Sequence, residues 1–443
     1  LRSKEVSHVL SQCSPRVVVV PSEFRGFNYT QMTTELLPQL PNVKHIITAG
    51  TPVAPGTIPF SSLLRETSLS PEHLQHVRPD PNDVGLIMYT SGTTGVSKGV
   101  MHTHNVLLGL ANSAAEALGQ SERGTILCLT PFSHLMGFGV ALCMALCHPR
   151  TKLVLAESLK ADDILAVIER ERVTAVISIP SQLMTVLDAF AQDRARYDTS
   201  SLKVWFYAGA TCPSEVIRRF MAETGTKVTT IYAMTEGAPY TYTVPDDPPE
   251  MAASTVGLPR RGAEVKIVDQ AGHSLPPEQA GEILTKGPYL FVGYYKRPDL
   301  TRETFTSDGW LRTGDRGMLD RDGYLHMVGR IEDMIIRGGE NIDPQEVEDL
   351  LLTHPKISQI VVIGIPEPIM GERVCACIVL KPKRQIELEE VRGYLKGRIA
   401  SFKLPERLEI VKEFPLTPAG KVQRFKLRED IAKKLKQQRG AEN

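Results

Sequence analysis

The 443-residue chain is too long for one hydrophobic core, and at about 100–200 residues per domain it predicts two or three domains. Hydrophobic residues make up 42% and charged residues 23%, which excludes disordered, collagenous and coiled-coil proteins. The 51 Lys and Arg residues balance the 51 Asp and Glu residues, so the net charge favours neither nucleic acid nor an acidic membrane as a partner. The longest uncharged apolar run, Leu135 to Cys147, is shorter than the roughly 20 residues of a transmembrane helix. Seven cysteines, an odd and sparse number, fit a reducing compartment better than a disulfide scaffold.

The first half of the chain alternates predicted strands and helices. Four valines at Val17 to Val20, ended by a proline, predict a buried strand. A helix begins near Asp162, and Val173 to Ile179 returns as a strand. The same unit repeats with a helix from Ser214 to Gly225 and a strand from Val228 to Tyr232. Such units imply a parallel sheet covered on both faces, so the predicted fold class is α/β.

The pattern changes after about residue 255. Three short strands punctuated by Gly, Pro and Asp predict an antiparallel barrel or meander: Glu264 to Val268, Gly281 to Thr285 and Gly323 to Val328. We therefore assign residues 1–330 to a large domain that includes a barrel-like subdomain at about residues 255–330.

Residues 331–443 are predicted to form a small α+β domain. Asp343 is a strong helix cap, because a proline and then an acidic residue follow it in the first turn. Strands are expected at Gln359 to Ile365 and Val374 to Leu380, and a second helix at Leu388 to Ala400. The segment is long enough to fold as a unit.

A loop rich in glycine and hydroxyl residues follows the predicted strand Leu86 to Tyr89 and ends at Lys98. Inward-facing N–H groups, hydroxyls and a lysine suit an anionic polyphosphate. The loop lacks the Walker spacing, and a plain surface loop is the alternative reading. The residues predicted to bind phosphate are Thr90, Ser91, Gly92, Thr93, Thr94, Gly95 and Lys98.

This loop resembles the signature of the adenylate-forming superfamily, which includes acyl-CoA synthetases, aryl-CoA ligases, luciferases and peptide-synthetase adenylation domains. Four further segments resemble the family's motifs in the family's order. They are Tyr232 to Glu236, Trp310 to Asp315, Gly329 to Asn341 (the family's hinge segment) and Pro415 to Lys421. Ile335 to Ile342, Cys375 to Cys377 and Phe425 to Arg428 most resemble the medium-chain acyl-CoA ligase branch.

The resemblance implies a large N-terminal adenylation domain of layered α/β sheets with a barrel-like subdomain, followed by a small mobile α+β domain. It also implies a two-step ligation. A carboxylate attacks the α-phosphate of Mg-ATP to give an acyl-adenylate and pyrophosphate, and coenzyme A then displaces AMP. The implied substrates are ATP, CoA and a medium-chain fatty or aryl carboxylic acid, with Mg²⁺ as the metal.

The resemblance also assigns roles to single residues. Thr235 would donate to the α-phosphate and Glu236 would hold Mg²⁺, which prefers oxygen ligands. Asp315 would bind the ribose hydroxyls beside Arg330. Lys421 would bridge the carboxylate and the α-phosphate as charge builds in the transition state.

The remaining implied contacts surround the base and the thiol. Gly209, Ala210 and Tyr232 would enclose the adenine. Rotation of the C-terminal domain would withdraw the catalytic lysine and present Gly338 and Gly339 to CoA.

Two further features admit a structural and a functional interpretation. His134 is either a core histidine or the family's gate to the acyl pocket, and we favour the gate. Cys375 and Cys377 point to one face of a strand, and we expect buried core there rather than a metal site.

Three positions depart from the family pattern: Ser97 replaces a proline, Ala233 replaces a glycine, and Glu332 occupies the hinge position that usually holds Lys or Asp. We also expect an N-terminal segment to precede Leu1, since family members carry one. The alternatives are a luciferase-like or 4-coumarate-like enzyme, or a truncated non-catalytic relative. Mitochondrial residence follows from the branch resemblance, and cytoplasmic residence is the alternative. The final Ala-Glu-Asn is not a peroxisomal address.

Overall fold

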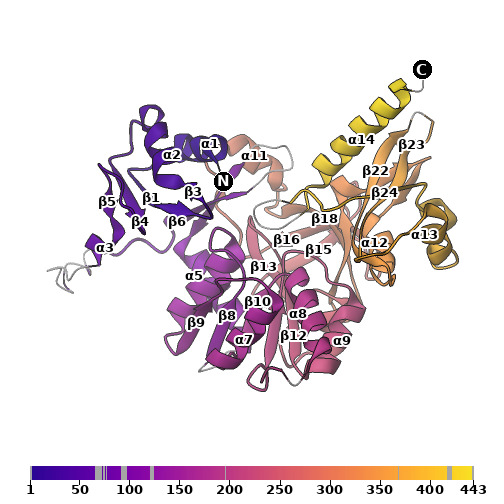
Figure 1. Ribbon diagram of the computed structural model, residues 1–443, viewed down its shortest axis with the longest axis horizontal. Coiled ribbons are helices and arrows are strands. Elements are labelled where there is room, and N and C mark those ends of the chain that lie inside the picture. Colours follow the sequence, from indigo (N-terminus) through magenta and orange to yellow (C-terminus); the bar gives the residue numbers. More distant parts are fainter. Residues whose placement is uncertain are drawn as a thin grey trace. The chain divides into compact units, whose positions relative to one another are not determined.

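The computed structural model describes residues 2–64, 72, 75, 77–90, 97–119, 124–194, 196–367, 369–416 and 422–441 (Figure 1). The chain divides into two compact units. The first holds residues 1–104 and 293–298, and the second holds residues 105–292 and 299–443. Every helix among the described residues is too short or too polar to cross a membrane.

The first unit contains a small parallel sheet and an antiparallel sheet. Its helical elements are α1 (Ser3–Cys13), α2 (Tyr29–Leu36), the 3₁₀ turn η1 (Leu37–Gln39) and α3 (Phe60–Leu63). The parallel sheet has the order β1 (Val17–Pro21), β4 (His45–Ala49), β5 (Ile58–Pro59), and β2 (Glu23–Phe24) pairs with β3 (Phe27–Asn28). The antiparallel sheet has the order β17 (Gly293–Tyr294), β7 (Lys98–Thr103), β6 (Val84–Thr90).

The four valines form the predicted strand β1, but the expectation that it is buried was wrong. Val18 is 7% exposed, whereas Val17 and Val19 are 44% and 58% exposed. Successive strand residues point to opposite faces, and only one face of β1 lies against the core of this unit.

The second unit is built on a seven-stranded sheet of order β14-β13-β12-β11-β10-β8-β9. The strands are β8 (Gly124–Cys128), β9 (Thr151–Leu155), β10 (Ala175–Ser178), β11 (Val204–Tyr207), β12 (Lys227–Met234), β13 (Gly237–Tyr242) and β14 (Leu258–Pro259). The strands from β9 to β12 run parallel, and β13 and β14 are antiparallel to their neighbours. The helices are α5 (His104–Ala117), the π-helix η2 (Met136–Cys143), α6 (Met144–Cys147), α7 (Ala161–Glu171), α8 (Pro180–Gln192), α9 (Ser214–Thr224) and α10 (Pro249–Ser254). The predicted α/β class is confirmed.

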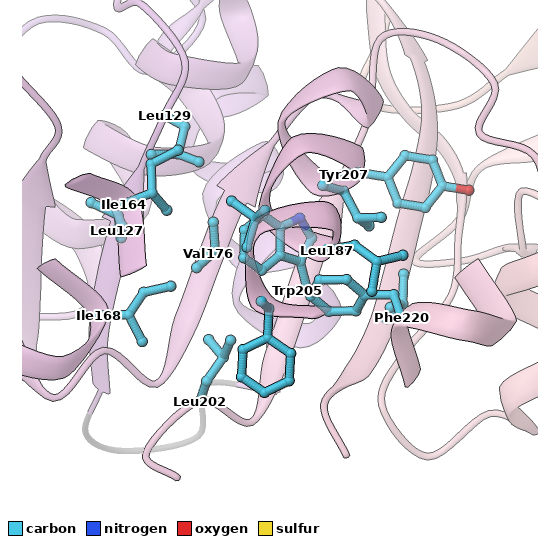
Figure 2. Close-up of a cluster of buried hydrophobic side chains, with 14 of the residues drawn as sticks. Leu127, Leu129, Ile164, Ile168, Val176, Leu187, Leu202, Trp205, Tyr207 and Phe220 are labelled. Carbon is cyan, nitrogen blue, oxygen red and sulfur yellow. The ribbon is translucent and has the colours of Figure 1, made fainter. Parts of the chain in front are cut away.

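The core of this sheet is packed by α7, α8 and α9 (Figure 2). Trp205 is fully buried, and its ring meets Phe220 edge-on with the centroids 5.1 Å apart. Its indole N–H donates to Ser178 Oγ at 2.7 Å, so the polar edge of the ring is satisfied. Every residue of β10 and β11 is buried, as predicted for parallel strands covered on both faces.

A four-stranded antiparallel meander follows, as the short strands predicted. Its order is β15 (Glu264–Val268), β16 (Gly281–Lys286), β18 (Leu311–Leu319), β19 (Leu325–Arg330), and α11 (Pro298–Thr304) lies between β17 and β18 in the chain. The sequence analysis missed β18, because two glycines and three charged residues conceal its alternation. Leu311, Thr313, Asp315 and Gly317 all occupy its buried face.

Residues 331–443, the C-terminal region, have a separate hydrophobic core. The elements are η3 (Ile331–Asp333), β20 (Ile335–Arg337), β21 (Glu340–Ile342), α12 (Pro344–Leu352), β22 (Ile357–Glu367), β23 (Gly371–Leu380), α13 (Leu388–Leu395), η4 (Ser401–Lys403), β24 (Arg407–Ile410) and α14 (Arg424–Ala441). The helix expected to reach Ala400 ends at Leu395, because Lys396 already leaves the helical conformation with a ψ of 128° and Gly397 follows with a φ of 78°. Cys375 and Cys377 are fully buried beneath α14, as predicted. The domain boundary at residue 330 stays a prediction.

Candidate active site

Three of the predicted nucleotide residues meet around the carboxylate of Asp315 on β18. The Tyr232 hydroxyl donates to Asp315 Oδ2 at 2.7 Å, and Arg330 Nε donates to Oδ1 at 3.0 Å. Asp315 and Arg330 are register partners on β18 and β19, whereas Tyr232 comes from β12 of the large sheet. The Asp315 N–H donates to Thr313 Oγ1 at 3.1 Å, which also fixes the backbone. The site therefore joins the meander to the parallel sheet.

The charges of this cluster are set by burial and by its neighbours. Burial, reinforced by the Asp315 charge, raises the pKa of Tyr232 well above its usual value, so the hydroxyl stays protonated and donates. Burial alone would lower the pKa of Arg330, but the charges of Asp315 and Glu332 outweigh it and the pKa is raised. Arg330 Nη1 lies 2.5 Å from Glu332 Oε1, so one guanidinium holds both carboxylates.

Three further loops with predicted site residues lie at one edge of the parallel sheet. Gly209 and Ala210 follow the end of β11, and Thr235 and Glu236 form the turn after β12. The segment with His134 follows β8, which pairs in parallel with β10. The carboxyl ends of parallel strands share one edge, and open α/β sheets bind ligands there.

The turn after β12 is shaped by two local features. The pairing of β12 with β13 shifts between Tyr232 and Met234, so Ala233 lies in a β-bulge. A Cβ at Gly237 would lie 2.7 Å from the Tyr240 hydroxyl, so a larger residue where β13 begins would require the Tyr240 side chain to shift. Thr235 and Glu236 are half-buried at the tip of this turn.

His134 precedes a π-helix, a rare form that is frequent at functional sites. The Met136 N–H points at His134 Nδ1 at 3.4 Å, which favours the tautomer with its proton on Nε2. A Cβ at Gly137 would lie 2.2 Å from the Pro131 carbonyl oxygen, so this glycine is needed for the close turn. His134 is half-buried.

The two ends of the predicted phosphate loop lie in the first unit. Thr90 ends β6, Lys98 begins β7, and the two are register partners, so the loop is a hairpin connection. Lys98 Nζ lies 5.3 Å from the centroid of the Tyr294 ring. The loop residues between them that were predicted to bind phosphate, Ser91, Gly92, Thr93, Thr94 and Gly95, lie outside the described residues.

In the C-terminal region, Gly338 and Gly339 form the two-residue turn between β20 and β21. Their φ values are 57° and 85°, the left-handed pair that such a hairpin turn requires. The Gly338 N–H donates to the Met370 carbonyl at 2.7 Å, which holds the turn on the neighbouring hairpin. Lys421 lies outside the described residues.

The sequence analysis missed an ion-pair network at the predicted hinge. Arg424 donates to both Glu348 oxygens at 2.7 and 2.8 Å, and its Nε lies 3.4 Å from Asp333 Oδ2. The partners are 76 and 91 residues away in the chain, so no local spacing could have revealed the pairs.

Comparisons with known proteins show which family this chain is similar to. Residues 1–295 match the family described as AMP-binding enzyme, and residues 346–421 match the AMP-binding enzyme C-terminal domain. A medium-chain fatty-acid–CoA ligase of Escherichia coli is 33% identical over 98% of this chain and 76% of its own length. A mitochondrial medium-chain acyl-CoA ligase of Danio rerio is 34% identical over 98% of this chain and 74% of its own. The structure of the anthranilate CoA ligase AuaEII with anthranoyl-AMP matches with a TM-score of 0.85 and 27% identity, covering 97% of this chain and 81% of that one.

The fold and these matches together define an AMP-forming ligase of the adenylate-forming class. The chain belongs to the AMP-binding enzyme family.

Proposed function

We propose that this chain joins a medium-chain fatty acid to coenzyme A through an acyl-adenylate. The observation that carries the proposal is the Asp315 carboxylate, held by Tyr232 and Arg330 beside the ligand-binding edge of the parallel sheet. The medium-chain ligases of Escherichia coli and Danio rerio, which match nearly the whole chain, support the choice of acid.

The nucleotide roles that we propose are those that the family resemblance implies, and the chemistry of each group suits them. Asp315 presents an acceptor pair to the two ribose hydroxyls, and Arg330 contacts the nucleotide from the next strand. The backbone turn at Gly209 and Ala210, together with Tyr232, bounds the adenine. For the triphosphate, we assign the β- and γ-phosphates to the loop from Thr90 to Lys98.

The first step forms a bond between the substrate carboxylate and the α-phosphorus and breaks the bond to pyrophosphate. Thr235 donates to the α-phosphate, and Lys421 neutralises the charge that develops between the two reacting anions. His134 borders the acyl group. In the second step the CoA thiolate attacks the acyl carbon and AMP leaves, while Gly338 and Gly339 border the incoming thiol.

The carboxylate of Glu236 is a suitable oxygen ligand for Mg²⁺. No cluster of three metal-ligating side chains occurs among the described residues, and Mg²⁺ is commonly held by one or two carboxylates and substrate phosphates. Glu236 would supply that carboxylate from the turn between β12 and β13. When bound, the ion would offset the charge of the phosphates.

An aryl acid is the second candidate substrate, because the matched anthranilate ligase structure holds an aryl-adenylate. Acyl-pocket selectivity depends on shape, and one methylene changes the binding free energy by only about 1–3 kcal/mol. The two classes of acid are therefore separated by assay.

The test is AMP release from Mg-ATP and CoA with saturated fatty acids of four to sixteen carbons and with several aryl acids. We expect medium-chain acids to support release, and Lys421→Ala to reduce it by at least about a hundredfold, as loss of an electrostatic transition-state contact does. The wild type is assayed for ATP binding in parallel. ATP binding without AMP release for any acid would overturn the ligase assignment and favour a non-catalytic relative.

The relatives include a bacterial and a mitochondrial enzyme. We propose that this protein resides in the mitochondrion, because it is similar to the mitochondrial enzyme of Danio rerio. Microscopy of the tagged protein against a mitochondrial marker tests this placement, and a diffuse cytoplasmic signal would contradict it.

A further inference from the structure

We propose that the Tyr232 hydroxyl is a positioning group for the nucleotide, which fixes the Asp315 carboxylate so that its two free acceptor sites face the ribose. The inference rests on the proposed function, because it assumes that Asp315 binds the ribose. It concerns the hydroxyl of Tyr232 rather than the face of its ring.

The first support is the count of hydrogen-bond sites on Asp315. An ionised carboxylate accepts about four hydrogen bonds, two on each oxygen. Tyr232 occupies one site on Oδ2 and Arg330 one site on Oδ1, at 2.7 and 3.0 Å. Counting only donors from the part of the chain that the structure describes, one acceptor site is left on each oxygen, which matches the two hydroxyls of a ribose.

The second support is the packing of the Tyr232 ring. The residue is only 7% exposed, and its ring packs on Tyr240 with the centroids 5.3 Å apart. The hydroxyl, at the far end of the ring, ends on the Asp315 carboxylate. The geometry thus gives the hydroxyl a defined partner in the site.

The third support is the difference between the two donors. The Arg330 side chain is 44% exposed and also binds Glu332, in the predicted hinge. Tyr232 lies on β12 within the parallel sheet, far from the hinge in the chain. Tyr232 can therefore hold Asp315 while Arg330 exchanges partners, which makes the tyrosine the constant member of the pair.

The test is a coupling experiment between the protein and the nucleotide. The equilibrium affinities of ATP, 2′-deoxy-ATP and 3′-deoxy-ATP are measured on the wild type and on Tyr232→Phe, with kcat and KM for ATP from the release assay. We expect Tyr232→Phe to bind ATP about tenfold more weakly, as for a lost bond to a charged group. It should bind at least one deoxy analogue within about threefold of the wild type, because both changes remove the same interaction. The kcat at saturating ATP should stay within about threefold of the wild type.

The matched control is Tyr242→Phe. Tyr242 is buried and donates to the carboxylate of Glu116, which also binds Arg261. The substitution Tyr242→Phe therefore removes the same kind of hydrogen bond at a place without an assigned nucleotide role. We expect this variant to keep the full wild-type preference for ATP over both deoxy analogues. An equal loss of preference in this control would overturn the inference, since general loosening would then explain both.

The remaining outcomes separate this inference from the proposed function. A wild type that prefers ATP over a deoxy analogue, together with a Tyr232→Phe variant that keeps that preference, would overturn only the role of the hydroxyl. A wild type without any ribose preference would refute the assignment of Asp315 and this inference with it. A second variant combines Tyr232→Phe with Asp315→Ala, and its preference for ATP over the deoxy analogues should equal that of Asp315→Ala alone. A further loss of preference in the double variant would contradict the proposal that Tyr232 acts through Asp315.

Discussion

Asp343 gives a pH-dependent prediction that can be worked through from the structure. It caps α12, and its Oδ1 accepts the Gln345 N–H at 2.9 Å. Its Oδ2 is buried and finds no hydrogen-bond partner among the described residues. That oxygen lies against Gly329, where an added Cβ would come within 2.5 Å of it. Burial raises the pKa of Asp343 from its usual 3.8 to about 6.

The sign follows from comparing the folded and unfolded chains. A raised pKa means that the folded state binds more protons between pH 3.8 and about 6, so stability from this group is greatest in acid and is lost as the pH rises through 6. At about 1.4 kcal/mol per pKa unit, the loss is about 3 kcal/mol at pH 8. Arg316 and Glu346 act on the same carboxylate, and both remain in the variant below.

The perturbation is Asp343→Asn, which keeps a good helix cap and removes the charge. We expect the free energy of unfolding of the variant, minus that of the wild type, to rise by about 2–3 kcal/mol from pH 4 to pH 8. The assay is hydrogen–deuterium exchange of residues 344–367, corrected for the intrinsic effect of pH, where this difference is about 30- to 150-fold in protection. Asp188→Asn, at a side chain that is 73% exposed, is the control for charge removal. Parallel pH profiles for the wild type and Asp343→Asn would refute the reasoning.

Four further variants test the packing. Arg424→Met should lower the free energy of unfolding by about 3–5 kcal/mol, because Glu348 is left charged and buried; a thermal midpoint equal to the wild type would contradict this. Gly257→Ala should prevent soluble folding, since its φ is 86° and the new Cβ would lie 2.1 Å from backbone. Gly225→Ala, at a φ of 68° with open space, should cost only about 1–2 kcal/mol, and similar solubility of the two variants would be evidence against steric exclusion. Trp205→Phe should cost about 2–3 kcal/mol by chemical denaturation, from lost volume and a lost bond to a buried serine, and an unchanged midpoint would show that the core refills.

Much of the local structure could be predicted from the sequence, because the signals are local. The glycine after α9 adopts the left-handed conformation expected of a helix end, with a φ of 68°. Asp343 caps α12 as its proline and acidic neighbours indicated. The motif order placed the chain in its family, and the family matches confirm this. The contributions of Lys421 and the loop from Ser91 to Gly95 stay predictions.

The sequence by itself determined the periodicity of the elements and the class of enzyme, since each helix or strand pattern and each family motif is made of residues close together in the chain. Only the tertiary structure decided which groups form hydrogen bonds or ion pairs with one another and which side chains are buried. Tyr232 and Asp315 are 83 residues apart, and only the contact of the meander with the parallel sheet joins them. The exposure of Val17 and Val19 was likewise decided by what packs on their strand. Contacts between distant segments depend on the three-dimensional packing of whole elements, to which no local pattern of side chains is sensitive.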